Sequence, residues 1–310
     1  MPIKIPNNLP AEKVLIEERI PLIKEDDAIR QDIRPMQIAL LNLMPNKIAT
    51  EIQIARTLGC SPLQVELTLL RTQTYTSKST PLDHLESFYK TFDEVKDQQF
   101  DGIIINGTPV ASMAYEDVKY WDELKEIFKW SETNVYSQFF LCWGAKAALY
   151  HYHGVNKTML PKKQFGVFQH KCINMIHPLT YGFNEAYPMP VAQVSIISAE
   201  DIAGQKNLEI LSDCDKTGVG LVYDEENRRV YLFKHPEYER HTLMDEYIRD
   251  VEKGDDVSVP QNYFPNDDPT QRPLMKWRAH RTLLFSNWLN LVYQGTPYNL
   301  ADLINVKKVS

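Results

Sequence analysis

The sequence contains little cysteine, and its four cysteines are widely spaced. Cys60, Cys142, Cys172 and Cys214 form no CxxC pair. Structural zinc sites and disulfide frameworks need closely spaced or numerous cysteines. We therefore expect reduced thiols, no metal site and no disulfide framework.

Strong basic character is also missing. Lys and Arg number 34 against 41 Asp and Glu, which gives a formal net charge of -7 at pH 7. Binding to a phosphate backbone requires a dense basic surface. The basic doublets at 162–163 and 228–229 would suffice only for one phosphorylated small molecule. The charge pattern argues against a nucleic-acid partner.

Long apolar runs are absent as well. The N-terminal segment lacks the uninterrupted apolar core of a signal peptide. The longest apolar stretch, around Ile38–Met44, is far too short to span a bilayer. We expect a cytoplasmic protein with no membrane partner.

What the sequence does contain is a globular composition. Of its 310 residues, 43% are hydrophobic and 24% are charged, which is enough apolar mass for a large core. We expect an irregular, charged N-terminal arm over residues 1–34, a single α/β domain over 35–296, and a C-terminal tail over 297–310.

Apolar strands alternate with helical segments in the first half of the predicted domain. Strands are predicted over 36–44, 64–71, 101–106 and 135–141, and helices over 46–58, from 81, and over 117–130. Such alternation with short connections is typical of a parallel sheet whose strands are buried on both faces.

The pattern changes after residue 155. Residues 219–223 and 229–233 predict a small antiparallel hairpin, and helices are predicted over 242–252 and 277–293. The predicted fold class is therefore α/β, a parallel sheet with helices on both faces and a small antiparallel hairpin.

Cys142 directly follows the fourth predicted strand and precedes a helix, in FFLCWGAKAALY. A lone cysteine is more often a buried structural residue. This position nevertheless favours a nucleophile, because ligands bind at the carboxyl ends of parallel strands and a helix N-terminus stabilises a thiolate. Gly144 and Ala145 leave room for a tight strand-to-helix elbow.

His235 and Glu237 end the predicted hairpin, in YLFKHPEYER. A cysteine nucleophile needs a neighbouring imidazole, and the imidazole needs a carboxylate that fixes its tautomer. His-Pro-Glu supplies both, although an isolated HxE is weak evidence. His151 and His153 could form a metal site, but their spacing of two places them on different helix faces, so we favour surface or packing roles.

The loop after the third predicted strand, Asn106–Ala111, is the third candidate. Backbone N–H groups of Val110 in this loop and of Trp143 are the expected oxyanion hole for a tetrahedral intermediate. A Gly-Thr-Pro stretch would also form a simple turn between a strand and a helix.

With these motifs in place, the chain resembles the homoserine O-acyltransferase (homoserine transsuccinylase) family over nearly its whole length. The stretches that carry the resemblance are LNLMPNKIATE, SPLQVELTLL, LESFYKTFDEV, YWDELKEIFKWS, CWGAKAALYHYHG, FGVFQH, FKHPEYER, YIRDVEKG, NYFPNDDP and LLFSNWLN. The resemblance implies a flavodoxin-like fold similar to class I glutamine amidotransferases, and a homodimer. It implies no cofactor, with acetyl-CoA or succinyl-CoA as co-substrate.

The resemblance also assigns roles to individual residues. It implies Cys142 as the acyl-thioester nucleophile, His235 as general base, Glu237 as its orienter, Glu246 and Arg249 near the amino-acid acceptor, and Lys47 and Lys163 as active-site lysines. Arg249 suits the acceptor carboxylate. The implied reaction is ping-pong, with the acyl group passing from CoA to the cysteine and then to a side-chain hydroxyl.

The sequence departs from the family pattern at several positions. Ala111 stands where the family usually has Glu in acetyl-specific members and Gly in succinyl-specific members. Ala192 stands where members acting on homoserine usually have Ser. Gln169 replaces a usual Glu, and Lys146 a usual Gln.

These departures lead us to expect an L-serine O-acetyltransferase of cysteine biosynthesis. The alternative is an L-homoserine O-acetyltransferase, or O-succinyltransferase, of methionine biosynthesis. A glutamine amidotransferase remains a remote alternative, since it would share the fold and the Cys-His-Glu arrangement.

Overall fold

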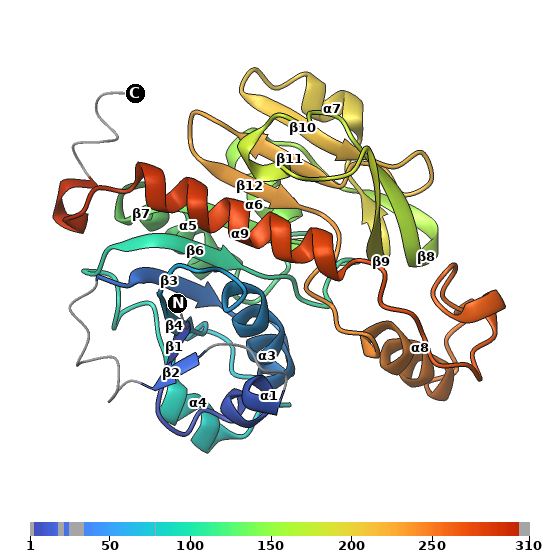
Figure 1. Cartoon of the computed structure of the whole chain (residues 1–310), viewed down its shortest axis with the longest axis horizontal. Coiled ribbons are helices and arrows are strands. Elements are labelled where there is room, and N and C mark those ends of the chain that lie inside the picture. Colours follow the sequence, from blue (N-terminus) through green and yellow to red (C-terminus); the bar gives the residue numbers. More distant parts are fainter. Residues whose placement is uncertain (1–2, 18–21, 25–33, 78, 304–310) are drawn as a thin grey trace.

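The structure, a computed structural model, describes residues 3–17, 22–24, 34–77 and 79–303. In this part of the chain, strands join into one 12-stranded sheet in the order β2-β1-β4-β3-β6-β7-β12-β11-β10-β8-β9, with β5 added to β4. Figure 1 shows this sheet crossing the whole molecule.

The central strands are parallel, as predicted for the first four of them, whereas the fifth was predicted only as part of the antiparallel hairpin. They are β3 (Met36–Leu41), β4 (Val65–Leu70), β6 (Phe100–Ile105), β7 (Val135–Leu141) and β12 (Arg229–Leu232). β3 ends at Leu41, earlier than predicted, and the side chain of the next residue, Asn42, forms hydrogen bonds with Tyr89 and Asn106. The parallel strands therefore end together at one edge of the sheet.

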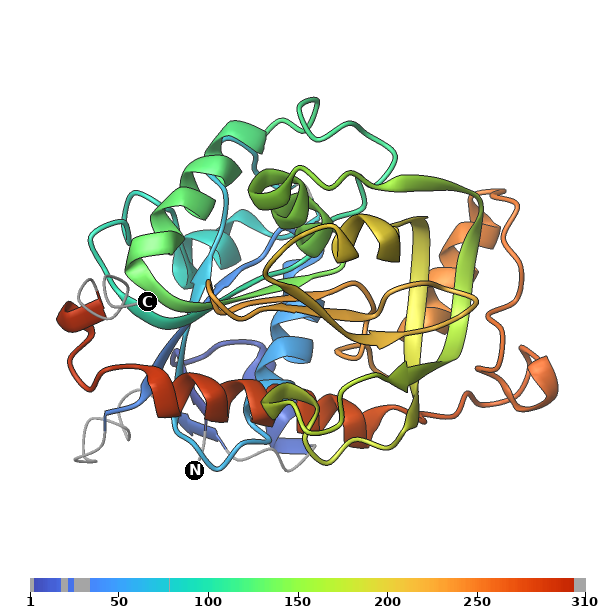
Figure 2. The ribbon, with the colours of Figure 1, turned by 90° about the horizontal axis from the view of Figure 1, so that it is seen from above.

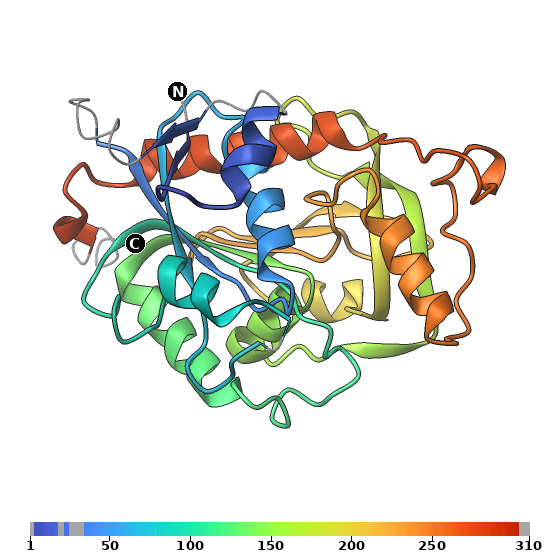
Figure 3. The ribbon, with the colours of Figure 1, turned by 90° about the horizontal axis from the view of Figure 1, so that it is seen from below.

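Helices cover both faces of the sheet, which confirms the α/β prediction (Figures 2 and 3). One face carries α1 (Ala11–Glu17), α3 (Lys47–Leu58) and α9 (Arg278–Gly295), and the other carries α5 (Trp121–Asn134) and α6 (Trp143–His153). Asn46 caps α3 as predicted, since its side chain accepts from the Ala49 N–H. No helix among the described residues combines the length and apolar character of a membrane span.

The helix predicted from residue 81 is α4 (Leu82–Phe88), which leads into β5 (Tyr89–Lys90). The helix predicted over 117–130 begins later, at Trp121, because the preceding residues form turns. The Val118 N–H bonds to the Tyr115 carbonyl and the Trp121 N–H to the Val118 carbonyl. The helix then extends to Asn134.

The prediction of an irregular N-terminal arm is wrong for the described part of that segment. β1 (Ile3–Ile5) pairs with β4 and with β2 (Leu22–Lys24), and α1 lies between them in the chain. Ile5, Leu9 and Leu15 are buried in the same core as α3. The prolines in this segment predict irregular structure. Burial of these three apolar side chains in the core nevertheless stabilises the strand and the helix.

The antiparallel part of the sheet is also larger than the predicted hairpin. β11 (Leu221–Asp224) and β12 form that hairpin, and β10 (Leu208–Asp213) joins it. Two long strands, β8 (Thr158–Cys172) and β9 (Ala186–Ile196), then make a ribbon. These two strands were not predicted, because lysine, glutamine and proline interrupt their apolar residues.

One helix packs against this ribbon, and the remaining elements are short. α8 (Thr242–Glu252) packs against the ribbon through Phe165, Leu243 and Tyr263. The short elements are η1 (Pro178–Thr180), α7 (Ala199–Ala203), η2 (Pro265–Asp267) and η3 (Leu300–Asp302). The ribbon and α8 thus lie beyond the carboxyl ends of the parallel strands (Figure 1).

Candidate active site

Cys142 occupies a sharp elbow between β7 and α6. Its φ of 50° and ψ of -113° lie in a region that non-glycine residues rarely adopt, which concentrates strain at one residue. The Cys142 N–H donates to the Leu232 carbonyl over 2.7 Å, which ties the elbow to the end of β12. A Cβ on Gly144 would lie 2.6 Å from the Asn106 carbonyl oxygen, so the turn requires glycine there.

His235 and Glu237 follow β12 directly and form a buried pair. The His235 Nδ1 lies 2.7 Å from Glu237 Oε1, and the His235 N–H donates to the Pro190 carbonyl. Tyr238 stacks on the imidazole with ring centroids 4.3 Å apart. Since Nδ1 faces the carboxylate, the Nε2 edge is available to the Cys142 thiol, whose charge interacts with that of His235.

The charges of this triad favour a reactive thiolate. Burial raises the pKa of Cys142, but His235 and then Lys146 outweigh burial, so the pKa lies below that of an ordinary thiol. Burial lowers the pKa of His235, yet Cys142 and Glu237 together hold that pKa well above its usual value. The pair therefore favours thiolate and imidazolium, the reactive form of a cysteine nucleophile.

The loop after β6 lies against the elbow. A Cβ on Gly107 would be 3.1 Å from the Trp143 backbone nitrogen and 3.2 Å from the Cys142 Cβ. The Val110 N–H instead donates to the Thr108 carbonyl over 2.9 Å, so the prediction of Val110 as an oxyanion donor does not fit this conformation. Gly107, another residue of the predicted loop Asn106–Ala111, is the one that lies beside the nucleophile. Ala111 lies on the same loop, half-buried against the core.

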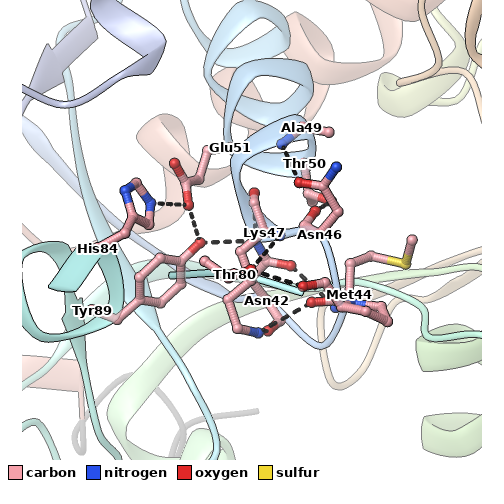
Figure 4. A network of polar contacts seen from close by, with 11 residues as sticks. Asn42, Met44, Asn46, Lys47, Ala49, Thr50, Glu51, Thr80, His84 and Tyr89 are labelled. Atoms are coloured by element: carbon pink, nitrogen blue, oxygen red, sulfur yellow. Dashed lines mark hydrogen bonds and ion pairs between the residues drawn. The ribbon is translucent and has the colours of Figure 1, made fainter. Parts of the chain in front are cut away.

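Lys47, at the start of α3, is buried at the carboxyl edge of the sheet (Figure 4). Its Nζ donates to the Asn42 carbonyl and, over 3.3 Å, to the Met44 carbonyl. Burial lowers the pKa of Lys47 to about 8, although Glu51 opposes the shift. In this conformation Lys47 fixes the loop that follows β3.

A buried polar network connects this loop to the nucleophile's surroundings. Tyr89 Oη donates to Glu51 Oε1 over 2.5 Å and accepts from Asn42 Nδ2 over 2.9 Å, and His84 Nε2 lies 2.9 Å from the same carboxylate oxygen (Figure 4). Asn42 Oδ1 then accepts from Asn106 Nδ2 over 3.0 Å. Because Asn106 immediately precedes Gly107, the network supports the loop beside Cys142.

The predicted acceptor residues gather where α8 faces the ribbon. Lys163 Nζ lies 2.6 Å from Glu246 Oε1 and 2.7 Å from Asp250 Oδ2, and Arg249 Nη2 lies 2.7 Å from Asp250 Oδ1. The Arg249 side chain is 55% exposed, so it can reach a ligand. Ala192 and Tyr247 of α8 both pack against the apolar cluster between α8 and the ribbon.

Tyr238 connects the predicted acceptor residues, Glu246 and Arg249, to the triad of Cys142, His235 and Glu237. It stacks on His235 and interacts electrostatically with Glu246, Glu237, Cys142 and Arg249. The structure therefore brings the predicted nucleophile, base, orienter and acceptor residues to one region. It adds Asp250, which the sequence did not single out because acidic residues are common in this helix.

The other histidine pair takes part in packing. His153 Nε2 lies 3.2 Å from Tyr231 Oη, and the His151 ring packs beside Phe128. Within the described residues, no group of three or more His, Cys, Asp or Glu side chains is arranged to hold a metal ion.

The family model for homoserine O-succinyltransferase matches residues 2–298. The chain belongs to that family. The protein is accordingly an O-acyltransferase. A relative from Hyphomonas neptunium named "Homoserine O-acetyltransferase" is 48% identical over 303 residues, which cover 98% of this chain and 99% of the relative. A relative of the same name from Acetivibrio thermocellus is 50% identical over 304 residues, covering 98% of this chain and 100% of the relative.

Solved structures confirm the fold expected of this family. A glutamine amidotransferase from Thermotoga maritima aligns with a TM-score of 0.57 at 10% identity, covering 84% of this chain and 99% of that one. One from Methylobacillus flagellatus aligns with a TM-score of 0.51 at 10% identity, covering 84% and 95%. Similarity at this level of identity shows the shared fold alone.

Proposed function

We propose that this acyltransferase is an L-homoserine O-acetyltransferase of methionine biosynthesis that works through a thioester on Cys142. The choice of L-homoserine as acceptor and acetyl-CoA as donor is supported by sequence identity. About half of all residues, over nearly the full chain, are identical to those of relatives named "Homoserine O-acetyltransferase". This replaces the L-serine preference expected from the sequence, which rested on the changes at Ala111 and Ala192 alone.

The first half-reaction uses the elbow and the triad. The Cys142 thiolate attacks the acetyl-CoA carbonyl, and the backbone N–H of Trp143, at the first residue of α6, is the donor to the developing oxyanion in this account. The carbon–sulfur bond to CoA then breaks, and the departing CoA thiolate takes a proton from the His235 imidazolium. Acetyl-Cys142 and neutral His235 remain.

The second half-reaction reverses these proton movements. His235 accepts the proton of the acceptor hydroxyl as its oxygen attacks the acetyl-thioester carbonyl. The carbon–sulfur bond to Cys142 breaks, which restores the thiolate beside the imidazolium. Glu237 holds the imidazole orientation through both steps. In this account Arg249 binds the acceptor carboxylate and Glu246 its ammonium, and Lys163 holds Glu246 in place.

An acceptor and donor screen tests this assignment. We expect kcat/KM to be highest for L-homoserine with acetyl-CoA, compared with L-serine as acceptor and with succinyl-CoA as donor. L-serine is the second candidate acceptor, because Ala192 departs from the serine that family members acting on homoserine usually carry. A higher kcat/KM for L-serine would overturn the homoserine assignment and leave the acyltransferase assignment unchanged.

Arg249→Ala separates the two half-reactions. We expect the acceptor KM to rise about ten- to a hundredfold, since a charge-assisted hydrogen bond contributes roughly 1.5–3 kcal/mol. Acetylation of Cys142 by acetyl-CoA should stay near the wild-type rate, because the arginine acts only on the acceptor. Arg278→Ala is the matched control, since it removes the same charge from an exposed position on α9. An equal loss in both half-reactions would contradict the acceptor role.

A further inference from the structure

Two buried lysines lie close to Cys142. Lys146 is in the first turn of α6, where its backbone N–H donates to the Cys142 carbonyl, and its side chain is almost fully enclosed. Lys234 immediately precedes His235 and is equally enclosed. In the described part of the chain, neither lysine forms an ion pair with a carboxylate. Buried ammonium groups normally need a compensating charge.

β9 holds both lysines through neutral acceptors. Lys146 Nζ donates to the Ser195 carbonyl over 2.6 Å and lies 3.1 Å from Ser195 Oγ. Lys234 Nζ donates to Gln193 Oε1 over 2.9 Å and to the Thr217 carbonyl over 2.6 Å. These contacts orient the ammonium groups but do not neutralise them. Burial lowers the pKa of Lys146, and the negative charge of Cys142 opposes that shift.

We propose that Lys146 is a positioning residue for the thioester chemistry, because its ammonium, held by Ser195, stabilises negative charge on the Cys142 sulfur. This inference rests on the nucleophilic role of Cys142 in the proposed function. A thiolate is the nucleophile in the first half-reaction and the leaving group in the second, so both steps benefit.

Several other groups face the same sulfur. They are His235 and Glu237 from the segment after β12, Lys234 from the end of that strand, and Tyr238. Burial, and then Lys146, lower the pKa of Lys234 to about 7, so Lys234 loses much of its charge near neutral pH. Burial lowers the pKa of Lys146 as well. Lys146 is nevertheless the lysine among the main groups that lower the Cys142 pKa, so its removal should matter most.

Alkylation of the whole protein without substrates tests the proposal. The rate at which iodoacetamide modifies the Cys142 peptide is measured against pH for wild type, Lys146→Gln, Lys146→Met and Lys146→Arg. We expect both neutral variants to raise the Cys142 pKa by about one unit or more, while arginine restores most of the effect. At pH values below the wild-type pKa, alkylation of a variant should be about tenfold slower than that of wild type for each unit by which the Cys142 pKa rises. Lys125→Gln, which removes an exposed charge from α5, is the matched control.

An unchanged Cys142 pKa in neutral variants that unfold at the wild-type temperature would overturn the proposal. If those variants do not fold, Ser195→Ala decides instead. It keeps Lys146 but removes one contact of Nζ, so a smaller rise in the Cys142 pKa is expected, and no rise would overturn the proposal. Because alkylation requires neither acetyl-CoA nor an acceptor, its outcome is independent of the acceptor screen.

Discussion

Replacing Cys142 with alanine is expected to abolish acyl transfer, with a loss of kcat/KM on the order of 10⁵-fold or more. The reason is that the variant has no atom to carry the acetyl group between CoA and the acceptor. Release of CoA thiol from acetyl-CoA, with and without L-homoserine, measures both half-reactions, and both should be lost together.

Cys60→Ala is the matched control for that change. Cys60 is also half-buried, but it lies at the end of α3, where its thiol donates to the Arg56 carbonyl. Its removal should leave kcat/KM within about twofold of wild type, because a substitution away from special features costs little. Substantial acyl transfer by Cys142→Ala, beyond the uncatalysed background, would rule out the thioester route.

Replacing His235 with alanine is expected to cost about three to four decades in kcat/KM, and Glu237→Ala less. The histidine is the largest of the groups that lower the Cys142 pKa, so the remaining activity should also shift to higher pH. Steady-state rates measured between about pH 6 and 10, roughly the range over which thiols titrate, would show both the loss of kcat/KM and the shift to higher pH.

The exposed His241, at the start of α8, provides a control for His235. His241→Ala removes an imidazole of the same kind outside the triad and should keep the wild-type pH profile. Near-normal turnover of His235→Ala would show that another group serves as the base.

The spatial arrangement of the proposed triad could be predicted because the positions of its residues follow from strand boundaries. The strand Val135–Leu141 was predicted with its observed ends, so Cys142 fell at the elbow. The hairpin strand placed His235 at the same edge, because parallel strands end together. For these residues, the strand ends predicted from the apolar pattern coincide with the sheet edge at which the side chains meet.

Other parts of the site could not be predicted, because they depend on contacts distant in sequence. Glu51, His84 and Tyr89 come from different elements and meet only in the folded core. The inward orientation of Lys146 depends on β9, a strand whose polar residues gave no apolar run. The position of Gly107 beside Trp143 likewise requires the register of β6 against β7.

The domain boundaries at 35 and 296, the homodimer and the absence of a cofactor stay predictions. So does the C-terminal tail, of which the structure describes only residues 297–303. α9 ends at Gly295, and the chain leaves the helix at Thr296.

Trapping the acyl-enzyme tests the central claim most directly. Wild-type protein is mixed with acetyl-CoA alone, quenched in acid and digested, and the mass of each cysteine peptide is measured. We predict one added acetyl group on the Cys142 peptide and none on the peptides of Cys60, Cys172 and Cys214. Subsequent L-homoserine should remove that group and yield an equal amount of O-acetylhomoserine. Formation of O-acetylhomoserine with Cys142 never acetylated, even at the earliest quench, would contradict the account.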